Sequence, residues 1–272
     1  MSRAELELAV DWAAAEGWNP GLDDAECFHA ADPDGFLMAF LGGEPVASIS
    51  VVRYADDFAF LGFYIVRPAF RGRGYGFRRW QAGIARLEGR TVGLDGVVAQ
   101  QANYARSGFA LAHRNIRYGG EVRVEAPSDS RLAAIGRDLV PAVTAYDRAF
   151  FPAPRDSFLR CWLQPEQRRG ITLVEEGRLH GYGVIRRCRT GHKIGPLFAE
   201  TAQAADLLFR ALAGGVEDGP IFLDVPEPNR ARIELTARYG LSPAFETARM
   251  YRGPAPALPL DRIYGITTFE LG

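Results

Sequence analysis

The chain has 272 residues, of which 47% are hydrophobic and 24% are charged, a composition typical of a folded globular protein and not of a disordered one. Its 32 basic and 33 acidic side chains give a formal net charge of −1, so no overall basic field exists to hold a nucleic acid. At roughly 100–200 residues per domain, this length favours two small domains.

Cys27, Cys161 and Cys188 are odd in number and widely spaced, and no CxxC motif or Cys/His cluster accompanies them. We therefore expect neither a disulfide framework nor a metal site. The first residues include acidic side chains and lack the apolar stretch of a signal peptide. No apolar run approaches the roughly 18 residues of a membrane span. These features predict a reduced, soluble, cytoplasmic protein with no membrane or nucleic-acid partner.

Hydrophobic periodicity predicts a mixed α/β first half. In chain order we expect a helix (4–16), a hairpin (36–53), a strand (58–66), a helix (75–88), a strand (91–98), a short helix (100–109) and a strand (110–119). In the helix over 75–88, Phe77, Trp80, Ile84 and Leu87 share one face, which we expect to be half-buried.

Residues 121–130 are polar and contain a proline, which is typical of a linker, and a helix is expected over 131–149. The first half then repeats as a hairpin (171–187), a strand (192–200), a helix (201–215), a strand with a short helix (220–241) and a final strand (244–253). Gly43 and Gly177 lie 134 residues apart, and Gly108 and Gly240 lie 132 apart. This agreement favours a tandem duplication, with domains over 1–124 and 125–272. The alternative is that two unrelated α/β halves share the same rhythm.

The most informative segment is Ile65–Phe77, IVRPAFRGRGYGF, which stands between a predicted strand and a predicted helix. Backbone N–H groups at such a helix start can bind phosphate oxygens. Glycines at 72, 74 and 76 remove side chains where a ligand would approach the main chain. Arg71 and Arg73 add charged donors suited to a diphosphate.

Two familiar phosphate-binding motifs do not fit this segment. A P-loop requires Gly-Lys, but Lys193, the only lysine in the chain, follows His192. A dinucleotide fingerprint requires GxGxxG. With Gly72 and Gly74 as the first two glycines, the third would be residue 77, which is Phe77. The remaining pattern, Arg71-Gly72-Arg73-Gly74-Tyr75-Gly76 after a strand, resembles the Gln/Arg-x-x-Gly-x-Gly/Ala loop of the GNAT acyltransferase superfamily.

The short helix supports this resemblance, because Asn103–Phe109 (NYARSGF) is similar to the Leu-Tyr-x-x-x-Gly-Phe signature of that superfamily. The resemblance implies two tandem α/β domains, each a mixed, mostly antiparallel sheet flanked by helices. It also implies that acetyl-CoA is the co-substrate and that Tyr104 protonates the departing CoA thiolate. The backbone of Ile65 and Val66 would pair with the pantetheine arm and supply the oxyanion donor. The cofactor-binding loop would comprise Arg71, Gly72, Arg73, Gly74, Tyr75 and Gly76.

The sequence departs from the family pattern at two places. Val97 stands where many relatives have an asparagine, and Gln100 or Gln101 could replace that contact. In the second half the matching loop, 198–203, has no glycine or arginine and carries Glu200, which would repel a diphosphate. Thr201 there reads as an ordinary helix cap. We therefore expect a second half that binds no CoA and is similar to the C-terminal domain of bacterial tandem acyltransferases of the YitH-like kind.

Candidate acceptor-binding residues are fewer. Asp95 ends a predicted strand, so it could bind or deprotonate a cationic amine, or it could cap a turn. His113 is either a base or a core histidine. Asp147 and Arg155 either contact the acceptor between the halves or form a local salt bridge.

Acyl transfer to an amine needs a deprotonated nucleophile, an oxyanion stabiliser and an acid for the leaving thiolate. We expect an acetyl-CoA-dependent N-acetyltransferase that acts on a small amine or amino-acid-like acceptor without a metal. The alternatives are a non-catalytic CoA-binding regulatory module and a protein-modifying acetyltransferase. A homodimer is left open.

Overall fold

The computed structural model describes residues 1–164 and 168–272. Its first half contains α1 (Arg3–Ala15), α2 (Asp24–Ala31), β1 (Phe36–Leu41), β2 (Glu44–Tyr54), β3 (Phe58–Val66), α3 (Tyr75–Ile84), β4 (Thr91–Val97), α4 (Gln101–Arg106) and β5 (Ala110–Gly120). Its second half contains β6 (Leu132–Ala134), α5 (Val140–Asp147), α6 (Asp156–Trp162), β7 (Arg168–Glu175), β8 (Arg178–Arg187), β9 (His192–Ala199), α7 (Ala202–Ala213), β10 (Ile221–Pro226), α8 (Ala231–Arg238), β11 (Ser242–Arg252) and β12 (Ile263–Gly265).

Local sequence signals account for most of these elements. α1 begins with a capping box between Ser2 and Glu5, and the buried residues of α1 recur at helical spacing. The β1–β2 hairpin turns through Gly42 and Gly43, whose φ angles of 57° and 86° suit a two-residue turn. The Thr201 side chain accepts a hydrogen bond from the Ala204 amide and caps α7, as predicted.

Two expectations about local structure are wrong, and two helices were missed. The segment 131–149 is not one helix, because β6 precedes α5 and Pro141 stands at the start of α5. α2 and α6 were not expected. Phe77 was expected on the buried face of α3, but its side chain is 63% exposed, whereas Trp80 and Leu87 are buried as predicted.

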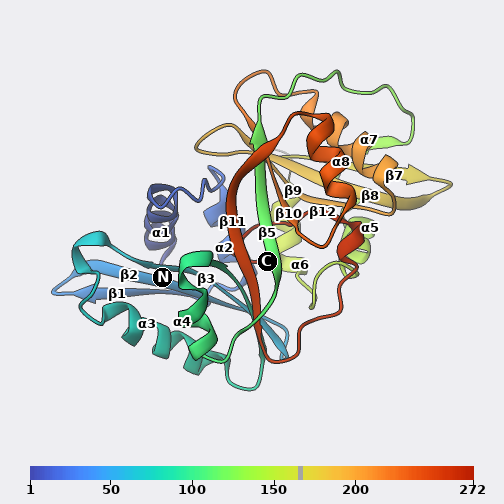
Figure 1. Cartoon of the computed structure of the whole chain (residues 1–272). Helices are drawn as coiled ribbons and strands as arrows, with labels where there is room; N and C mark the ends of the chain where they lie inside the picture. The colour runs from blue at the N-terminus through green and yellow to red at the C-terminus, as the bar shows by residue number, and fades with distance from the viewer. Residues whose placement is uncertain (165–167) are drawn as a thin grey trace.

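The two halves build one sheet by exchanging their last strands. The strand order is β1-β2-β3-β4-β11-β5-β10-β9-β8-β7-β6, with β12 paired to β9. β11 of the second half therefore pairs with β4, and β5 of the first half pairs with β10, both antiparallel. The two long strands run side by side through the middle of the molecule (Figure 1). The order is symmetric about them, which places equivalent elements of the two halves around a pseudo-twofold axis.

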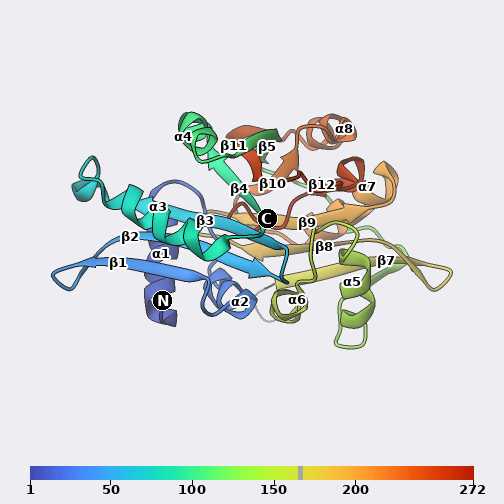
Figure 2. The ribbon, with the colours of Figure 1, turned by 90° about the horizontal axis from the view of Figure 1, so that it is seen from below.

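Helices cover both faces of this sheet. α1, α2, α5 and α6 lie on one side, and α4, α7 and α8 lie on the other (Figure 2). The residues of α1, α2, α5 and α6 share one buried hydrophobic cluster that joins the two halves. The helices of the other face form separate clusters, one around Trp80 of α3 and one around Leu208 of α7. Each half thus has its own core on one face and a common core on the other.

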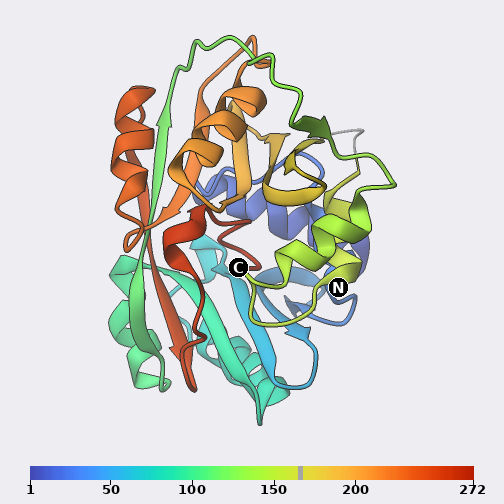
Figure 3. The same ribbon diagram turned by 90° about the vertical axis from the view of Figure 1, so that its right-hand side faces the viewer.

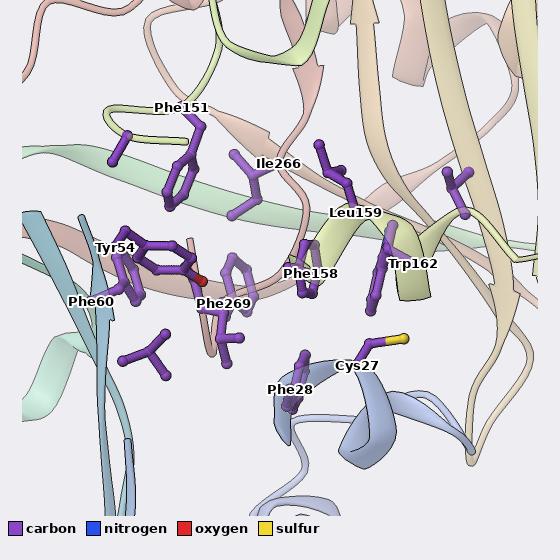
Figure 4. Close-up of a cluster of buried hydrophobic side chains, with 14 of the residues drawn as sticks. Cys27, Phe28, Tyr54, Phe60, Phe151, Phe158, Leu159, Trp162, Ile266 and Phe269 are labelled. Atoms are coloured by element: carbon purple, nitrogen blue, oxygen red, sulfur yellow. The ribbon is translucent and has the colours of Figure 1, made fainter. Parts of the chain in front are cut away.

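The common core is centred where α2 meets α6 across the pseudo-twofold axis. Phe28 and Trp162 stack with ring centroids 6.3 Å apart, and Cys27 forms a disulfide with Cys161 (Figure 4 shows this cluster). The expectation that no disulfide forms is therefore wrong for this pair. Their separation of 134 residues equals the spacing of Gly43 and Gly177, so the bond joins equivalent positions of the two halves. Cys188 is free and buried.

Residues 263–272 form a segment that returns to the centre of the molecule, and every one of them is buried. Figure 4 shows Ile266 and Phe269 of this segment among the side chains of the common core, and Figure 3 shows the chain end in the middle of the fold. The segment passes between two equivalent glycines. An added Cβ at Gly195 of β9 would lie 2.6 Å from the Thr267 carbonyl oxygen, and one at Gly62 of β3 would lie 2.2 Å from the Glu270 carbonyl oxygen. Larger residues at either position would block the segment.

No helix in the described residues is long and apolar enough to cross a bilayer.

Candidate functional site

A cleft opens where β3 and β4 part. The two strands pair in parallel from Phe58 with Thr91 as far as Leu61 with Leu94, and their register ends there. β3 continues to Val66 and β4 to Val97 on either side of a cavity of ≈ 500 Å³, within the usual range for small-molecule sites. Ile65 and Val66, predicted to pair with the pantetheine arm, line this cavity.

The backbone of β3 is irregular where it borders the cleft. β2 and β3 shift register between Ser48 and Ser50, which forms a bulge that includes Phe63. Phe63 has a φ of 45°, a left-handed conformation that is costly for an aromatic residue. The Ser48 hydroxyl donates a hydrogen bond of 2.7 Å to the Phe63 carbonyl oxygen and holds this shape. The bulge turns the backbone of β3 away from a regular ladder at the wall of the cleft.

The glycine-arginine loop closes one end of the cleft. Gly72 and Gly74 have φ angles of 73° and 81°, which favour glycine, and an added Cβ at either would meet no atom within 4 Å. Space in front of the loop is therefore open to a ligand. Arg71 donates a hydrogen bond of 2.8 Å to the Val66 carbonyl oxygen and pairs with Glu16, while its side chain stays 50% exposed.

α3 starts directly after this loop and points its N-terminus at the cleft. Its first turn contains no acidic residue, so the positive end of its dipole is uncompensated by the helix itself. An added Cβ at Gly76 would lie 2.8 Å from both Tyr64 Oη and Val66 Cγ2, so glycine lets the helix start pack closely on β3. Of the predicted loop residues, Arg71, Gly72, Gly74 and Gly76 line the cavity, whereas Arg73 packs beside Phe70 and Tyr75 lies nearby.

Tyr104 lines the cleft from α4 and is only 8% exposed. Its ring lies against Gly96 of β4, where an added Cβ would come within 2.2 Å of Cε2, and beside Trp80 at a centroid distance of 5.6 Å. Burial, with a smaller contribution from Tyr64, raises the pKa of the Tyr104 phenol to about 12. The hydroxyl therefore keeps its proton at neutral pH and can donate it to an anion.

Asp95 also lines the cleft, but its carboxylate is engaged by other residues. Arg249 of β11 donates hydrogen bonds of 3.0 and 2.6 Å to its two oxygens, and Asn115 of β5 donates one of 2.7 Å. The side chain of Asp95 is completely buried. These contacts tie the exchanged strand β11 to β4.

The other candidate residues lie away from the cleft. His113 borders a separate small cavity, where burial and the charge of Arg249 lower its pKa to about 3, so it is neutral at physiological pH. Asp147 and Arg155 form a buried bidentate ion pair at 2.6 and 2.8 Å, and Tyr182 also donates to Asp147. The local salt bridge considered for this pair is confirmed.

The second half lacks an open equivalent of the cleft. β9 and β10 pair in parallel from Ile221 with His192 to Leu223 with Ile194 and then part, as β3 and β4 do. β12 fills the gap there, because Ile263 and Gly265 pair with β9 and the Ile266 amide donates to the Asp224 carbonyl oxygen at 2.8 Å. Glu200 pairs with Arg262 just before α7. The groove that corresponds to the first cleft is thus occupied by the chain itself.

Residues that sequence reasoning missed also line the first cleft. These are Trp18, Phe245, Thr247, Phe269 and Glu270, and all but Trp18 come from the second half. Glu270 is 2% exposed, and neither of its carboxylate oxygens has a hydrogen-bond partner among the described residues. Burial raises the pKa of Glu270. The positive charges of Lys193, Arg117 and Arg186 lower it by a smaller amount. No local motif marks these residues, because only the strand exchange and the buried segment 263–272 bring them to the cleft.

Comparison with known proteins identifies the family. A model of the acetyltransferase (GNAT) family matches residues 5–109, and a model of an acetyltransferase (GNAT) domain matches residues 143–265. The chain is 34% identical over 272 residues to the holothin acyltransferase of Pseudoalteromonas sp. (strain SANK 73390), covering 100% of this chain and 92% of that one. It is 22% identical to the uncharacterized N-acetyltransferase YitH of Bacillus subtilis, over 78% of this chain and 76% of that one. The chain belongs to the GNAT acyltransferase family and has two GNAT domains.

Solved structures show the same architecture. A Pyrococcus horikoshii structure, assigned only provisionally as an acetyltransferase, superimposes with a TM-score of 0.83 at 23% identity, covering 100% of this chain and 94% of that one. A tandem GNAT protein from the clavulanic acid biosynthesis pathway gives a TM-score of 0.63 at 16% identity, covering 94% of this chain and 98% of that one. The predicted fold of tandem GNAT-like domains is confirmed. Within residues 1–164 and 168–272, no cluster of three His, Cys, Asp or Glu side chains could hold a metal ion.

Proposed function

We propose that the protein transfers an acetyl group from acetyl-CoA to the amine of a small molecule. The observation that carries this proposal is the parting of β3 and β4 beside the glycine-arginine loop. The unpaired edge of β3 at Ile65 and Val66 supplies backbone donors and acceptors for an extended pantetheine arm. Arg71, the open glycines and the N-terminus of α3 suit the diphosphate.

The far wall of the cleft supports a small acceptor. Trp18, Phe63, Phe245 and Phe269 give the cavity an aromatic lining. An aromatic-lined cavity suits a flat, mostly apolar amine better than an extended protein segment. The 34% identical relative is a holothin acyltransferase, so holothin is the first acceptor to test.

In this proposal the amine attacks the thioester carbonyl while backbone amides of β3 near the bulge stabilise the oxyanion. Tyr104 then gives its proton to the CoA thiolate as the carbon–sulfur bond breaks. The substrate-binding role of Asp95 stays a prediction, and its hydrogen bonds to Arg249 and Asn115 favour a positioning role for it instead. We propose that residues 1–124 hold the cofactor and that 125–272 contribute to the acceptor wall.

A thiol-release assay with acetyl-CoA, with holothin and a panel of primary amines as acceptors, tests this function. We expect stoichiometric release of CoA and a mass increase of the acceptor by one acetyl group. A regulatory module would bind CoA without releasing thiol. A protein-modifying enzyme would acetylate a protein lysine and leave all small amines unchanged.

A further inference from the structure

Glu270 combines two properties that are rarely found together in a folded protein. It is a buried carboxylate without a hydrogen-bonded partner among the described residues, and it lines the cavity that holds Tyr104. Leaving a buried charged group unpaired is costly, so such groups are uncommon unless they have a ligand or a chemical role. The mechanism above assigns no residue that removes a proton from the acceptor amine.

Three cations and one anion face Glu270. The cations that face it are Arg117 of β5, Arg186 of β8 and Lys193 of β9, and Asp24 of α2 is the facing anion. Each cation has another partner, but only Nε of Arg186 is engaged, and its Nη1 and Nη2 have no hydrogen-bond partner among the described residues. Arg117 binds Asp224 at 2.6 and 2.8 Å, Arg186 lies 3.0 Å from Asp24, and Lys193 donates to the Asn19 carbonyl oxygen at 2.9 Å. The remaining charges on the cavity wall are Glu16, Arg71 and Asp95, and Glu16 and Asp95 are each paired with an arginine.

The route of the chain delivers this carboxylate to the first half. β12 fills the gap between β9 and β10, and the segment then passes Gly195 and reaches Gly62, where the Glu270 carbonyl oxygen occupies the space of a missing side chain. The Thr268 hydroxyl accepts a hydrogen bond of 2.9 Å from the Leu271 amide, which fixes the turn around Glu270. The closed groove of the second half thus anchors a segment that completes the open cleft of the first.

We propose that Glu270 is the catalytic base, which takes a proton from the acceptor's ammonium group in the cleft between β3 and β4. This inference rests on the proposed acetyl transfer. One proton passes from the ammonium nitrogen to the Glu270 carboxylate, and the freed lone pair forms the new carbon–nitrogen bond. The carbon–sulfur bond breaks, and the thiolate takes the proton of Tyr104. The nitrogen's second proton restores Tyr104 through solvent, and Glu270 releases its proton, so amide, CoA thiol and one proton leave.

The test compares Glu270→Gln with the wild type, using acetyl-CoA and holothin. Glutamine keeps the size of the side chain and cannot accept the proton. We expect kcat to fall about 10²–10⁴-fold, while CoA affinity measured by calorimetry stays within twofold. Since a base must be deprotonated, wild-type kcat/KM rises with pH through the pKa of Glu270, which burial places above the usual glutamate range. This rise should be absent in Glu270→Gln, and Glu270→Asp should restore part of the rate.

Glu246→Gln is the matched control, because Glu246 lies on β11 and pairs with Arg114 at 3.3 Å with a half-exposed side chain. We expect its kcat and pH profile to equal those of the wild type. If Glu270→Gln keeps the wild-type kcat and pH profile while the wild type acetylates holothin, Glu270 only balances the buried charges and the proposal is overturned. If the wild type binds CoA but acetylates no amine, the proposed function fails and the role of Glu270 fails with it.

Discussion

Arg249 of β11 binds Asp95 of β4 through two hydrogen bonds, and Arg117 of β5 binds Asp224 of β10 in the same bidentate way. The two pairs occupy equivalent positions of the two halves, and each joins an exchanged strand to its new neighbour. Both are almost completely buried. The exchange that brings β11 to the cleft is therefore fixed by two equivalent ion pairs in the interior.

Breaking one of these pairs should destabilise the protein strongly. Arg249→Met leaves the Asp95 carboxylate buried and uncompensated, so we expect a loss of about 3–5 kcal/mol in the free energy of unfolding, measured in urea. Adding Asp95→Asn should recover part of the loss, since it removes the unpaired charge. Arg114→Met, which breaks only the half-exposed pair with Glu246, should cost about 1 kcal/mol or less. Equal effects of the two arginine variants would contradict this account.

Changing the loop should abolish CoA binding without unfolding the chain. Gly74→Glu fills the open space before α3 and adds a negative charge at its N-terminus, so calorimetry should detect no CoA binding. The left-handed backbone at Gly74 adds strain to this variant. Gly177→Glu is the control, because Gly177 has a similar φ of 76° and equally open surroundings in the hairpin of the second half. If Gly74→Glu binds CoA as tightly as Gly177→Glu, the loop is not the diphosphate site.

One CoA should bind per chain. The gap between β9 and β10 is filled by β12, and the loop that corresponds to the glycine-arginine loop carries Glu200. Calorimetric titration of the wild type with CoA should therefore give a stoichiometry of one. A stoichiometry of two would mean that residues 263–272 leave their groove.

Tyr104→Phe keeps the ring that packs against Gly96 and Trp80 and removes only the proton donor. We expect kcat to fall by about 10²–10⁴-fold with CoA affinity unchanged. With its pKa raised to about 12, Tyr104 stays protonated up to strongly basic pH, so it should cause no loss of wild-type activity below about pH 10. Tyr239→Phe, which removes a hydroxyl bound to Asp206 in the second half, should leave kcat unchanged. Weaker CoA binding with unchanged kcat would instead make Tyr104 a contact residue.

The disulfide between Cys27 and Cys161 should be measurable in the purified protein. Titration of thiols in denaturant without reductant should find one thiol per chain, that of Cys188. Reduction should lower the free energy of unfolding by about 2–4 kcal/mol, because the bond closes a long loop. Cys27→Ser should lower it similarly and become insensitive to reductant. Three thiols and a stability that reductant does not change would show that the pair is reduced in solution.

The sequence by itself determined the local elements and the loop side of the cleft. The pattern of apolar residues predicted α1, β3 and β4 closely. α1 buries one face, and β3 and β4 are short runs that are mostly buried on both faces. The glycine-arginine loop and Tyr104 lie within one local strand-loop-helix pattern, so their place in the cleft could be expected from residues near them in sequence. The loss of the loop at 198–203 was visible for the same reason.

Only the tertiary structure decided which residues of the second half line the cleft. Whether β11 pairs with β4 or with strands of its own half depends on side-chain contacts more than 150 residues apart, such as that of Asp95 with Arg249. The pairing of Cys27 with Cys161 follows from the packing of α2 on α6 across the pseudo-twofold axis, which no local spacing reveals. Glu270 lies in a segment that matches no sequence motif. It reaches the cleft because Gly62 and Gly195 leave room for the chain to pass. Local propensity acts over a few residues, whereas these contacts depend on how two complete halves pack together.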